Sequence, residues 1–149
     1  MSTEPAPIQR ARFSELDART IYRILRLRQE VFAVEQDCAY LDLDGRDLEP
    51  ATVHVWIDEQ PEAPAVSACL RLLSDPDGAT QIGRIVTSAT ARRRGLGRRL
   101  MTHALETTGS PWVLKAQSRL TGWYTVFGFR AAGPEFIEDG IPHTPMRRS

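Results

Sequence analysis

The sequence predicts an α+β domain in which helices flank a mixed, largely antiparallel sheet. Three observations lead to this fold class. Apolar positions near the N-terminus have helical spacing, short apolar runs in the middle are bounded by turn residues, and residues 82–106 form a strand–loop–helix pattern. A chain of 149 residues with 42% hydrophobic residues is long enough for a real core. We therefore expect residues 1–149 to form a single domain, with residues 1–8 disordered.

The first expected element is a helix that begins at an N-cap between Ser14 and Asp17 and continues to Val34. Residues 53–57 (VHVWI) are expected to form a buried strand, and residues 65–73 form a second strand after a turn rich in proline and glutamate. Pro76 and Gly78 stand where a type I turn needs them, so a hairpin should lead into the strand that contains Ile82.

The second half begins with an amphipathic helix over residues 96–106, whose apolar face carries Leu96, Leu100, Met101, Ala104 and Leu105. A strand over 112–116, a helix from about 119 to 127 that ends at Gly128, and two short strands between 129 and 146 complete the chain. The strands on either side of the 96–106 helix should run parallel, because a right-handed crossover joins them.

The loop before this helix has the composition of a phosphate site. Arg92, Arg93 and Arg94 precede Gly95 and Gly97. Glycine lets the backbone approach a ligand closely, N–H groups at a helix start attract anions, and arginine adds charge-assisted hydrogen bonds. The pattern indicates a pyrophosphate site. A solvated basic helix start and a weak nucleic-acid patch are the alternatives.

Two familiar phosphate motifs do not fit this loop. A Walker-type loop needs Lys and Ser or Thr after its last glycine, and here Arg98 and Arg99 follow Gly97. A dinucleotide-binding fingerprint needs a third small residue, and Leu100 stands there.

The pattern Arg-x-x-Gly-x-Gly from Arg92 to Gly97 follows an Ile-Val-Thr strand and precedes an amphipathic helix. It resembles the acetyl-coenzyme A motif of the GNAT acyltransferase superfamily. A second segment, from Tyr124 to Phe129, resembles the Tyr-x-x-x-Gly-Phe segment of the same family. Residues 28–48 (RQEVFAVEQDCAYLDLDGRDL) and 138–146 (EDGIPHTPM) resemble its ElaA-like branch. The order of elements matches nearly the whole chain, so the resemblance implies a GNAT-like fold whose parallel strand pair splays apart.

The resemblance also implies acetyl-CoA as co-substrate, with no metal, and assigns its contacts. The pantetheine arm would lie along Ile85, Val86 and Thr87. Gln117 stands where many relatives have Asn, and its amide would reach one methylene further. The pyrophosphate would bind the loop residues Arg92, Arg93, Arg94, Gly95, Leu96, Gly97 and Arg98.

For catalysis, the resemblance nominates Tyr124 as the acid that protonates the departing thiolate. Its alternative role is packing beside Trp123 and Phe127. Many relatives place a carboxylate base on the central strand, but this strand carries Arg84 and Thr87. The base is therefore left open among a water chain and four side chains: Glu35, His54, Glu138 and His143.

The acid-rich segment 35–49 has two open interpretations: a funnel that attracts a cationic amine, or a solvated loop. An EF-hand register would need ligands at Tyr40 and Ala51, so a calcium loop does not fit. Cys38 could suggest a nucleophile, but direct transfer needs none, and a small buried thiol is the alternative.

We expect an acetyl-CoA-dependent N-acetyltransferase that moves the acetyl group directly to a primary amine of a small molecule or peptide. A non-catalytic acyl-CoA sensor on the same fold is the alternative. A nucleic-acid binder comes third, because the net charge is zero. We expect no nucleic-acid or membrane partner, leave a homodimer open, and expect a cytoplasmic location. The two cysteines lack CxxC spacing and the N-terminus lacks an apolar targeting segment.

Overall fold

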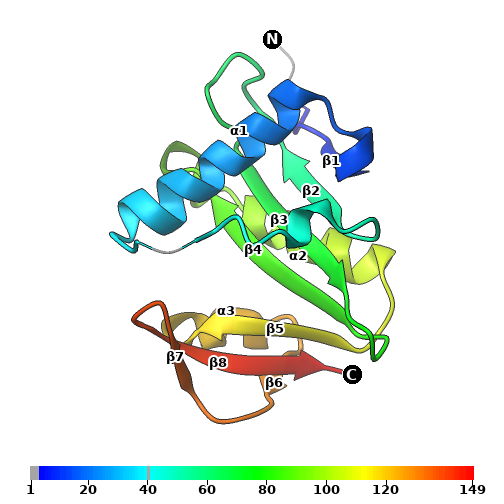
Figure 1. The fold of residues 1–149 in the computed structure, drawn as a ribbon, viewed down its shortest axis with the longest axis vertical. Coiled ribbons are helices and arrows are strands. Elements are labelled where there is room, and N and C mark those ends of the chain that lie inside the picture. The colour runs from blue at the N-terminus through cyan, green and yellow to red at the C-terminus, as the bar shows by residue number, and fades with distance from the viewer. Residues whose placement is uncertain (1–3, 40) are drawn as a thin grey trace.

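The computed structural model describes residues 4–39 and 41–149. One sheet runs through these residues, with the neighbour order β1-β2-β3-β4-β5-β8-β6 and with β7 paired to β8 (Figure 1). Neighbouring strands are antiparallel except for β4 and β5. The strands are β1 (Ile8–Arg12), β2 (Val53–Ile57), β3 (Ala68–Ser74), β4 (Thr80–Thr87), β5 (Trp112–Gln117), β6 (Arg130–Ala131), β7 (Phe136–Glu138) and β8 (Ile141–Arg148).

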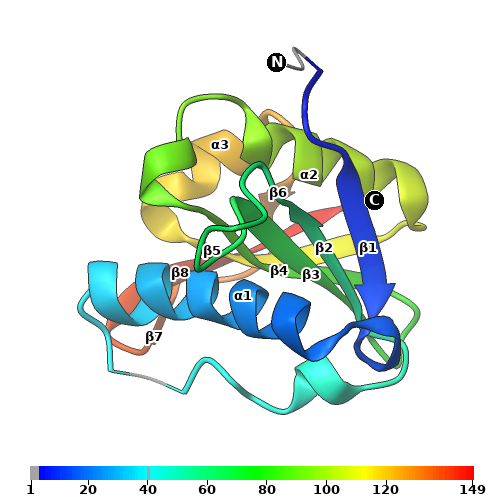
Figure 2. The same cartoon turned by 90° about the horizontal axis from the view of Figure 1, so that it is seen from above.

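Helices cover both faces of the sheet. The helix α1 (Ala18–Arg28) lies on one face, and α2 (Leu96–Thr107) and α3 (Thr121–Thr125) lie on the other (Figure 2). Asp17 begins α1 as its N-cap, because its carboxylate accepts a hydrogen bond from the Thr20 amide at 2.7 Å. After Arg28 the helix continues as a π-helical segment, Gln29–Glu35, so the predicted extent to Val34 is confirmed. No helix in the described part of the chain has the length and apolar character that a bilayer crossing needs.

Side-chain alternation along the central strands builds two apolar layers. Val55 on β2 and Leu70 on β3 point to the α2 side and pack with Leu100. Trp56 and Cys69 point to the α1 side and pack with the helix. Because successive residues of a strand face opposite ways, β2 and β3 are buried on both faces and have almost continuous apolar sequences.

The termini differ from the sequence expectation. Ile8 begins β1 and pairs with Ile57, although residues 1–8 were expected to be disordered. The Ala6 carbonyl also accepts a hydrogen bond from Arg99 Nη2 at 2.7 Å, which holds the segment against α2. Residues 1–3 lie outside the described residues. After Gly128 the chain forms three strands, where two were expected.

Candidate active site

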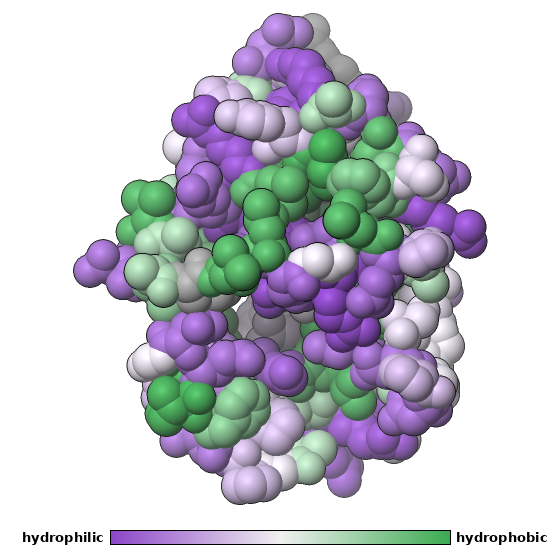
Figure 3. All heavy atoms as spheres, in the orientation of Figure 1, coloured by the Kyte–Doolittle hydropathy of each residue, from purple (hydrophilic) through white to green (hydrophobic). Residues whose placement is uncertain are grey.

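The parallel pair β4–β5 separates after two residues. Thr80 pairs with Trp112 and Gln81 with Val113, and the described structure has no further pair between these strands. Beyond this point β4 pairs with β3, and β5 with β8. Backbone groups of residues 82–87 and 114–117 that face this gap therefore have no ladder partner across it. The ribbons of β4 and β5 diverge in Figure 1. Figure 3, in the same orientation, shows a hollow in the surface between the part of the molecule that contains β4 and the part that contains β5. We call this feature the β4–β5 split; it confirms the predicted splay.

The residues expected to hold the pantetheine arm lie along the β4 side of this split. Val86 is buried on the α1 side, whereas Ile85 packs against the apolar layer on the α2 side. The backbone carbonyl of Thr87 already accepts a hydrogen bond from Arg92 Nε at 3.1 Å. A ligand running along β4 would therefore find free backbone groups before Thr87 rather than at its carbonyl.

The loop after β4 presents backbone N–H groups. Arg93 and Gly95 both have left-handed backbone conformations, with φ of 66° and 77°. Gly95 is the N-cap of α2, and no side chain caps the helix start. Leu96 is buried and anchors this first turn in the core. The first amides of α2, with the positive end of its dipole, therefore form an anion-binding geometry directly after the split.

The structure separates the loop arginines into two classes. The Arg92 guanidinium forms a bidentate ion pair with Glu35, at 2.7 and 2.6 Å. Arg94 forms a similar pair with Glu59 in the loop after β2. Arg93 and Arg98 are exposed and have no ion pair within the described residues. Nothing in the sequence indicated the two carboxylate partners, because they are remote along the chain.

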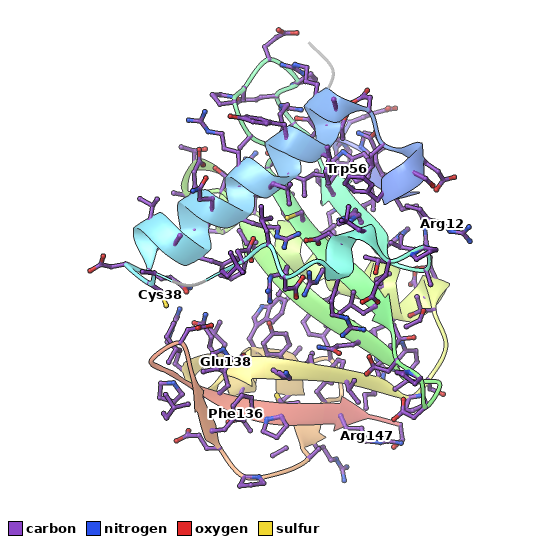
Figure 4. All side chains as sticks on the ribbon, in the orientation of Figure 1. Arg12, Cys38, Trp56, Phe136, Glu138 and Arg147 are labelled. Atoms are coloured by element: carbon purple, nitrogen blue, oxygen red, sulfur yellow. The ribbon has the colours of Figure 1, made fainter. Side chains whose placement is uncertain are left out.

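The end of the π-helical segment spans the split. Glu35 holds Arg92 on the β4 side, while the next residue, Gln36, accepts a hydrogen bond from Gln117 Nε2 at 3.1 Å on the β5 side. Gln117 Oε1 accepts from Arg119 Nη2 at 3.0 Å. Cys38, which is buried, lies near β7 and its thiol contacts the Asp139 carbonyl at 3.0 Å (Figure 4).

Tyr124 lies on α3 within the apolar layer behind the split. Its ring makes edge contacts with Trp123 and Phe129, with centroid distances of 5.0 and 6.4 Å. Its hydroxyl has no hydrogen-bond partner among the described residues, and burial raises the pKa of Tyr124 to about 12. Trp123 also lies against the start of α2, since a Cβ added at Gly97 would be 3.4 Å from Trp123 Cζ2. Trp123, directly before the Tyr-x-x-x-Gly-Phe segment, thus packs against the start of α2.

The four candidate bases occupy different environments. His54 is 1% exposed, and its Nε2 lies 3.3 Å from the Asp47 carbonyl; burial lowers its pKa. Glu35 is held by Arg92, and this hydrogen bond lowers the pKa of its carboxyl. Glu138 is exposed on β7. His143 on β8 pairs with Gln117 in register and stacks on Phe136. The structure therefore brings His143, and not His54, to the β5 end of the split.

Three carboxylates of the acid-rich segment are held in ion pairs, although the loop between them is largely exposed to solvent. Asp42 and Asp47 are buried and both bind Arg28 of α1, at 2.9 and 2.7 Å. Asp44 binds Arg71 of β3 at 2.6 Å, and this hydrogen bond lowers the pKa of its carboxyl. The segment is thus fastened to the α1 face of the sheet by charge pairs. Arg28, Arg71 and Arg84, which come from remote elements, neutralise these carboxylates, and the sequence alone did not reveal that pairing.

Among the residues that the structure describes, no three His, Cys, Asp or Glu side chains are grouped closely enough to hold a metal ion.

Known proteins with similar sequences and structures agree on one family. The model of the acetyltransferase (GNAT) domain matches residues 49–149. A UPF0039 protein of Mycobacterium tuberculosis (strain ATCC 25618 / H37Rv) is 44% identical over 145 residues, which cover 95% of this chain and 92% of the relative. Protein ElaA of Escherichia coli (strain K12) is 37% identical over 140 residues, or 91% of each chain.

Two solved structures superpose on almost the entire chain. An acyl-CoA N-acyltransferase from Pseudomonas aeruginosa has a TM-score of 0.88 and 38% identity, covering 97% of this chain and 99% of that chain. The crystal structure of Escherichia coli ElaA has a TM-score of 0.87 and 34% identity over the same shares. With the split β4–β5 pair and the glycine-containing loop before α2, these matches show that the chain belongs to the GNAT acetyltransferase family.

Proposed function

We propose that this protein transfers an acetyl group directly from acetyl-CoA to a primary amine of a small molecule or peptide. The observation that carries the proposal is the β4–β5 split, which opens directly beside the uncapped start of α2. An extended chain with a pyrophosphate group at one end suits an unpaired strand edge followed by free helix amides. The name of the similar Pseudomonas structure, an acyl-CoA N-acyltransferase, supports this class of donor.

The side chains present fit such a donor. The unpaired edge of β4 at Ile85 and Val86 would bind the pantetheine amides, and the Gln117 side chain would add a contact from β5. The amides after Gly95 would receive the pyrophosphate, together with Arg93 and Arg98, which have no ion pair among the residues that the structure describes. The bound donor supplies an activated acetyl thioester. The chain's own residues position it and manage protons.

Tyr124 is proposed as the hydrogen-bond donor to the leaving sulfur. A phenol whose pKa is about 12 stays protonated at neutral pH, so its hydroxyl always carries the required proton. A thiol with a pKa near 8.5 is nevertheless the stronger acid, so Tyr124 stabilises developing negative charge more readily than it delivers a proton. The lack of another partner for this hydroxyl within the described residues leaves it available.

His143 is proposed as the general base. Its Nδ1 lies 2.8 Å from the Ile141 carbonyl oxygen. Because a carbonyl can only accept, Nδ1 carries the proton and Nε2 is left as the acceptor in the neutral ring. The stacking on Phe136, with ring centroids 5.7 Å apart, fixes the ring plane. Neutralising a lysine-like amine at pH 7 costs roughly 4.6 kcal/mol, whereas an α-amine costs about 1 kcal/mol, so a base matters most for the former.

The acceptor amine and the acyl donor are the expected partners. We propose a cytoplasmic location because Cys38 and Cys69 are both free thiols.

The absence of a carboxylate on β4, where Arg84 stands, favours the non-catalytic acyl-CoA sensor as the second candidate.

One experiment separates these functions. The protein is incubated with acetyl-CoA and a panel of primary amines, peptides and polyamines, while released thiol and acetylated product are measured together. Calorimetry with CoA runs in parallel. Thiol release that depends on an amine, with a matching acetylated product, supports the transferase. CoA binding without acceptor-dependent release would indicate the sensor, and absence of CoA binding would refute both.

A further inference from the structure

The central strand β4 contains a bulge opposite Leu70 of β3. Arg71 of β3 pairs with Gly83, and Cys69 pairs with Val86, so one β3 residue, Leu70, faces two residues of β4. The extra residue changes the alternation of side chains. Ile82 and Ile85 are three positions apart, yet both contact the apolar layer on the α2 side. In a regular strand they would point to opposite faces.

The bulge requires an unusual backbone conformation at Arg84. Its φ is 53°, in the left-handed region that a side chain with a Cβ rarely adopts. A bulge bends its strand and increases the local twist. This one begins at Arg84, three residues after Gln81, the last β4 residue paired with β5, and it includes Ile85, the first residue proposed to bind the pantetheine arm.

A buried carboxylate holds the Arg84 side chain. Asp42 Oδ1 forms an ion pair with Arg84 Nε at 2.6 Å, without hydrogen-bond geometry, and the Asp42 carbonyl accepts a hydrogen bond from Arg84 Nη2 at 3.2 Å. Asp44 Oδ2 lies farther from Arg84 Nη2, at 3.5 Å. The side chain of Asp42 is 9% exposed and that of Arg84 is 24% exposed. Asp42 is itself fixed by Arg28 of α1. The loop that carries Asp42 therefore connects α1 to the bulge.

We infer that Asp42 and Arg84 form a positioning pair, which holds the β4 bulge in its left-handed conformation and thereby keeps the β4–β5 split shaped for the donor. This inference rests on the proposed function. Neither residue needs to touch the donor. Arg84 fixes the backbone of residues 85–87, and Asp42 acts through Arg84. If the tether is lost, residue 84 relaxes toward an extended conformation and only a fraction of molecules keeps the binding-competent bulge. The measured affinity then falls in proportion to that fraction.

The test compares variants at position 84 with and without Asp42. Arg84→Ala should weaken CoA binding by roughly tenfold, because alanine has a Cβ and lacks the tether. Arg84→Gly should bind CoA within about twofold of the wild-type protein, because glycine adopts positive φ without a tether. Asp42→Asn should weaken binding in the wild-type background, but should have no effect when combined with Arg84→Gly.

Asp47→Asn is the matched control, since Asp47 pairs with Arg28 and Arg71 in the same buried cluster but makes no contact with Arg84 in the described structure. Amide signals of residues 85–87 in ¹⁵N spectra without CoA give a second measurement. They should move in Arg84→Ala and Asp42→Asn, and stay near wild-type positions in Arg84→Gly.

Equal CoA affinities and unmoved signals across the series would overturn the inference, as would an equal effect of Asp42→Asn in both backgrounds. If the wild-type protein does not bind CoA but the signals respond as expected, the positioning role stands and the proposed donor is wrong.

Discussion

Glu35 and Arg92 form a bidentate ion pair that joins the end of the π-helical segment to the loop before α2, with N–O distances of 2.7 and 2.6 Å. Both side chains are about two-fifths exposed, at 43% and 39%, so solvent screens the pair. The contact nevertheless lowers the pKa of Glu35, mainly through the hydrogen bonds from Arg92. A carboxylate that is already paired and weakly basic is a poor acceptor for an amine proton.

The first prediction therefore concerns the base. His143→Gln should lower kcat/KM for a lysine-like amine by at least about 10²-fold, because it removes the proposed proton acceptor. Glu35→Gln should retain kcat within a few-fold, because its carboxylate is occupied by Arg92. Steady-state rates of thiol release for the two variants provide the measurement. A large fall in kcat for Glu35→Gln and little change for His143→Gln would reverse the assignment.

The second prediction concerns the start of α2. Gly95→Val should weaken CoA binding by at least tenfold, because a side chain there strains a backbone with φ of 77° and covers the amides. A Cβ at Gly95 would meet no protein atom within 4 Å, so the effect should come from the backbone and the ligand rather than from packing.

Gly78→Val is a suitable control for this strain. Gly78 has a φ of 90° in the β3–β4 turn, and a Cβ there also has open space. Its variant should lose comparable stability and keep its CoA affinity in calorimetry. Unchanged binding by a folded Gly95→Val protein would remove the phosphate site from this loop.

Local patterns predicted the central part of the fold well. The bounds of β2 agree with the apolar run VHVWI, and the helix α2 begins where its apolar periodicity does. The parallel splayed pair followed from the strand–loop–helix order together with the family resemblance. The first strand, β1, was missed because Gln9, Arg10 and Arg12 are polar. Its pairing with the sheet edge at β2 depends on the folded neighbour and not on its own sequence.

The candidate site was predicted less completely, and the reason is physical. Charge pairs such as Arg94–Glu59 and Arg28–Asp47 join residues that are 35 and 19 positions apart, and sequence spacing carries no signal for them. The bulge at Arg84 is hidden for the same reason. An arginine gives no indication of positive φ, and the Asp42 partner that holds it there comes from another element.

The third prediction uses the buried thiol of Cys69. Burial raises its pKa from 9.0 to about 12, so the folded protein keeps this proton after the unfolded chain has released it. A raised folded-state pKa stabilises the protein below the unfolded pKa, and that stability is lost as the pH rises. Between pH 9 and 12 the free energy of unfolding should fall by roughly 1.4 kcal/mol per pH unit from this group.

Urea unfolding at several alkaline pH values measures this slope. Cys69→Ala should flatten this slope. Cys38→Ala removes the other thiol, so it should keep the contribution of Cys69 to the slope. The comparison uses slopes and not absolute stabilities, because either truncation also changes packing. An identical alkaline slope in the wild-type and Cys69→Ala proteins would show that the thiol does not stay protonated in the folded state.

The last prediction concerns Tyr124. Tyr124→Phe keeps the ring that contacts Trp123 and Phe129 and removes a hydroxyl with no other hydrogen-bond partner in the described structure, so the variant should fold normally. Turnover should fall toward the lower end of the roughly 10²–10⁴-fold range for general acids, because the phenol donates a hydrogen bond and is a weaker acid than the departing thiol. CoA affinity should barely change.

Since the pKa of Tyr124 is about 12, its own ionisation should not limit activity between pH 6 and about 10. The effect of the substitution should shrink at high pH for any step limited by deprotonation of the amine. Single-turnover rates across this pH range provide the measurement. Tyr22→Phe, which changes an exposed tyrosine on α1, is the matched control. A wild-type rate in Tyr124→Phe would leave Tyr124 a packing residue and would favour the sensor.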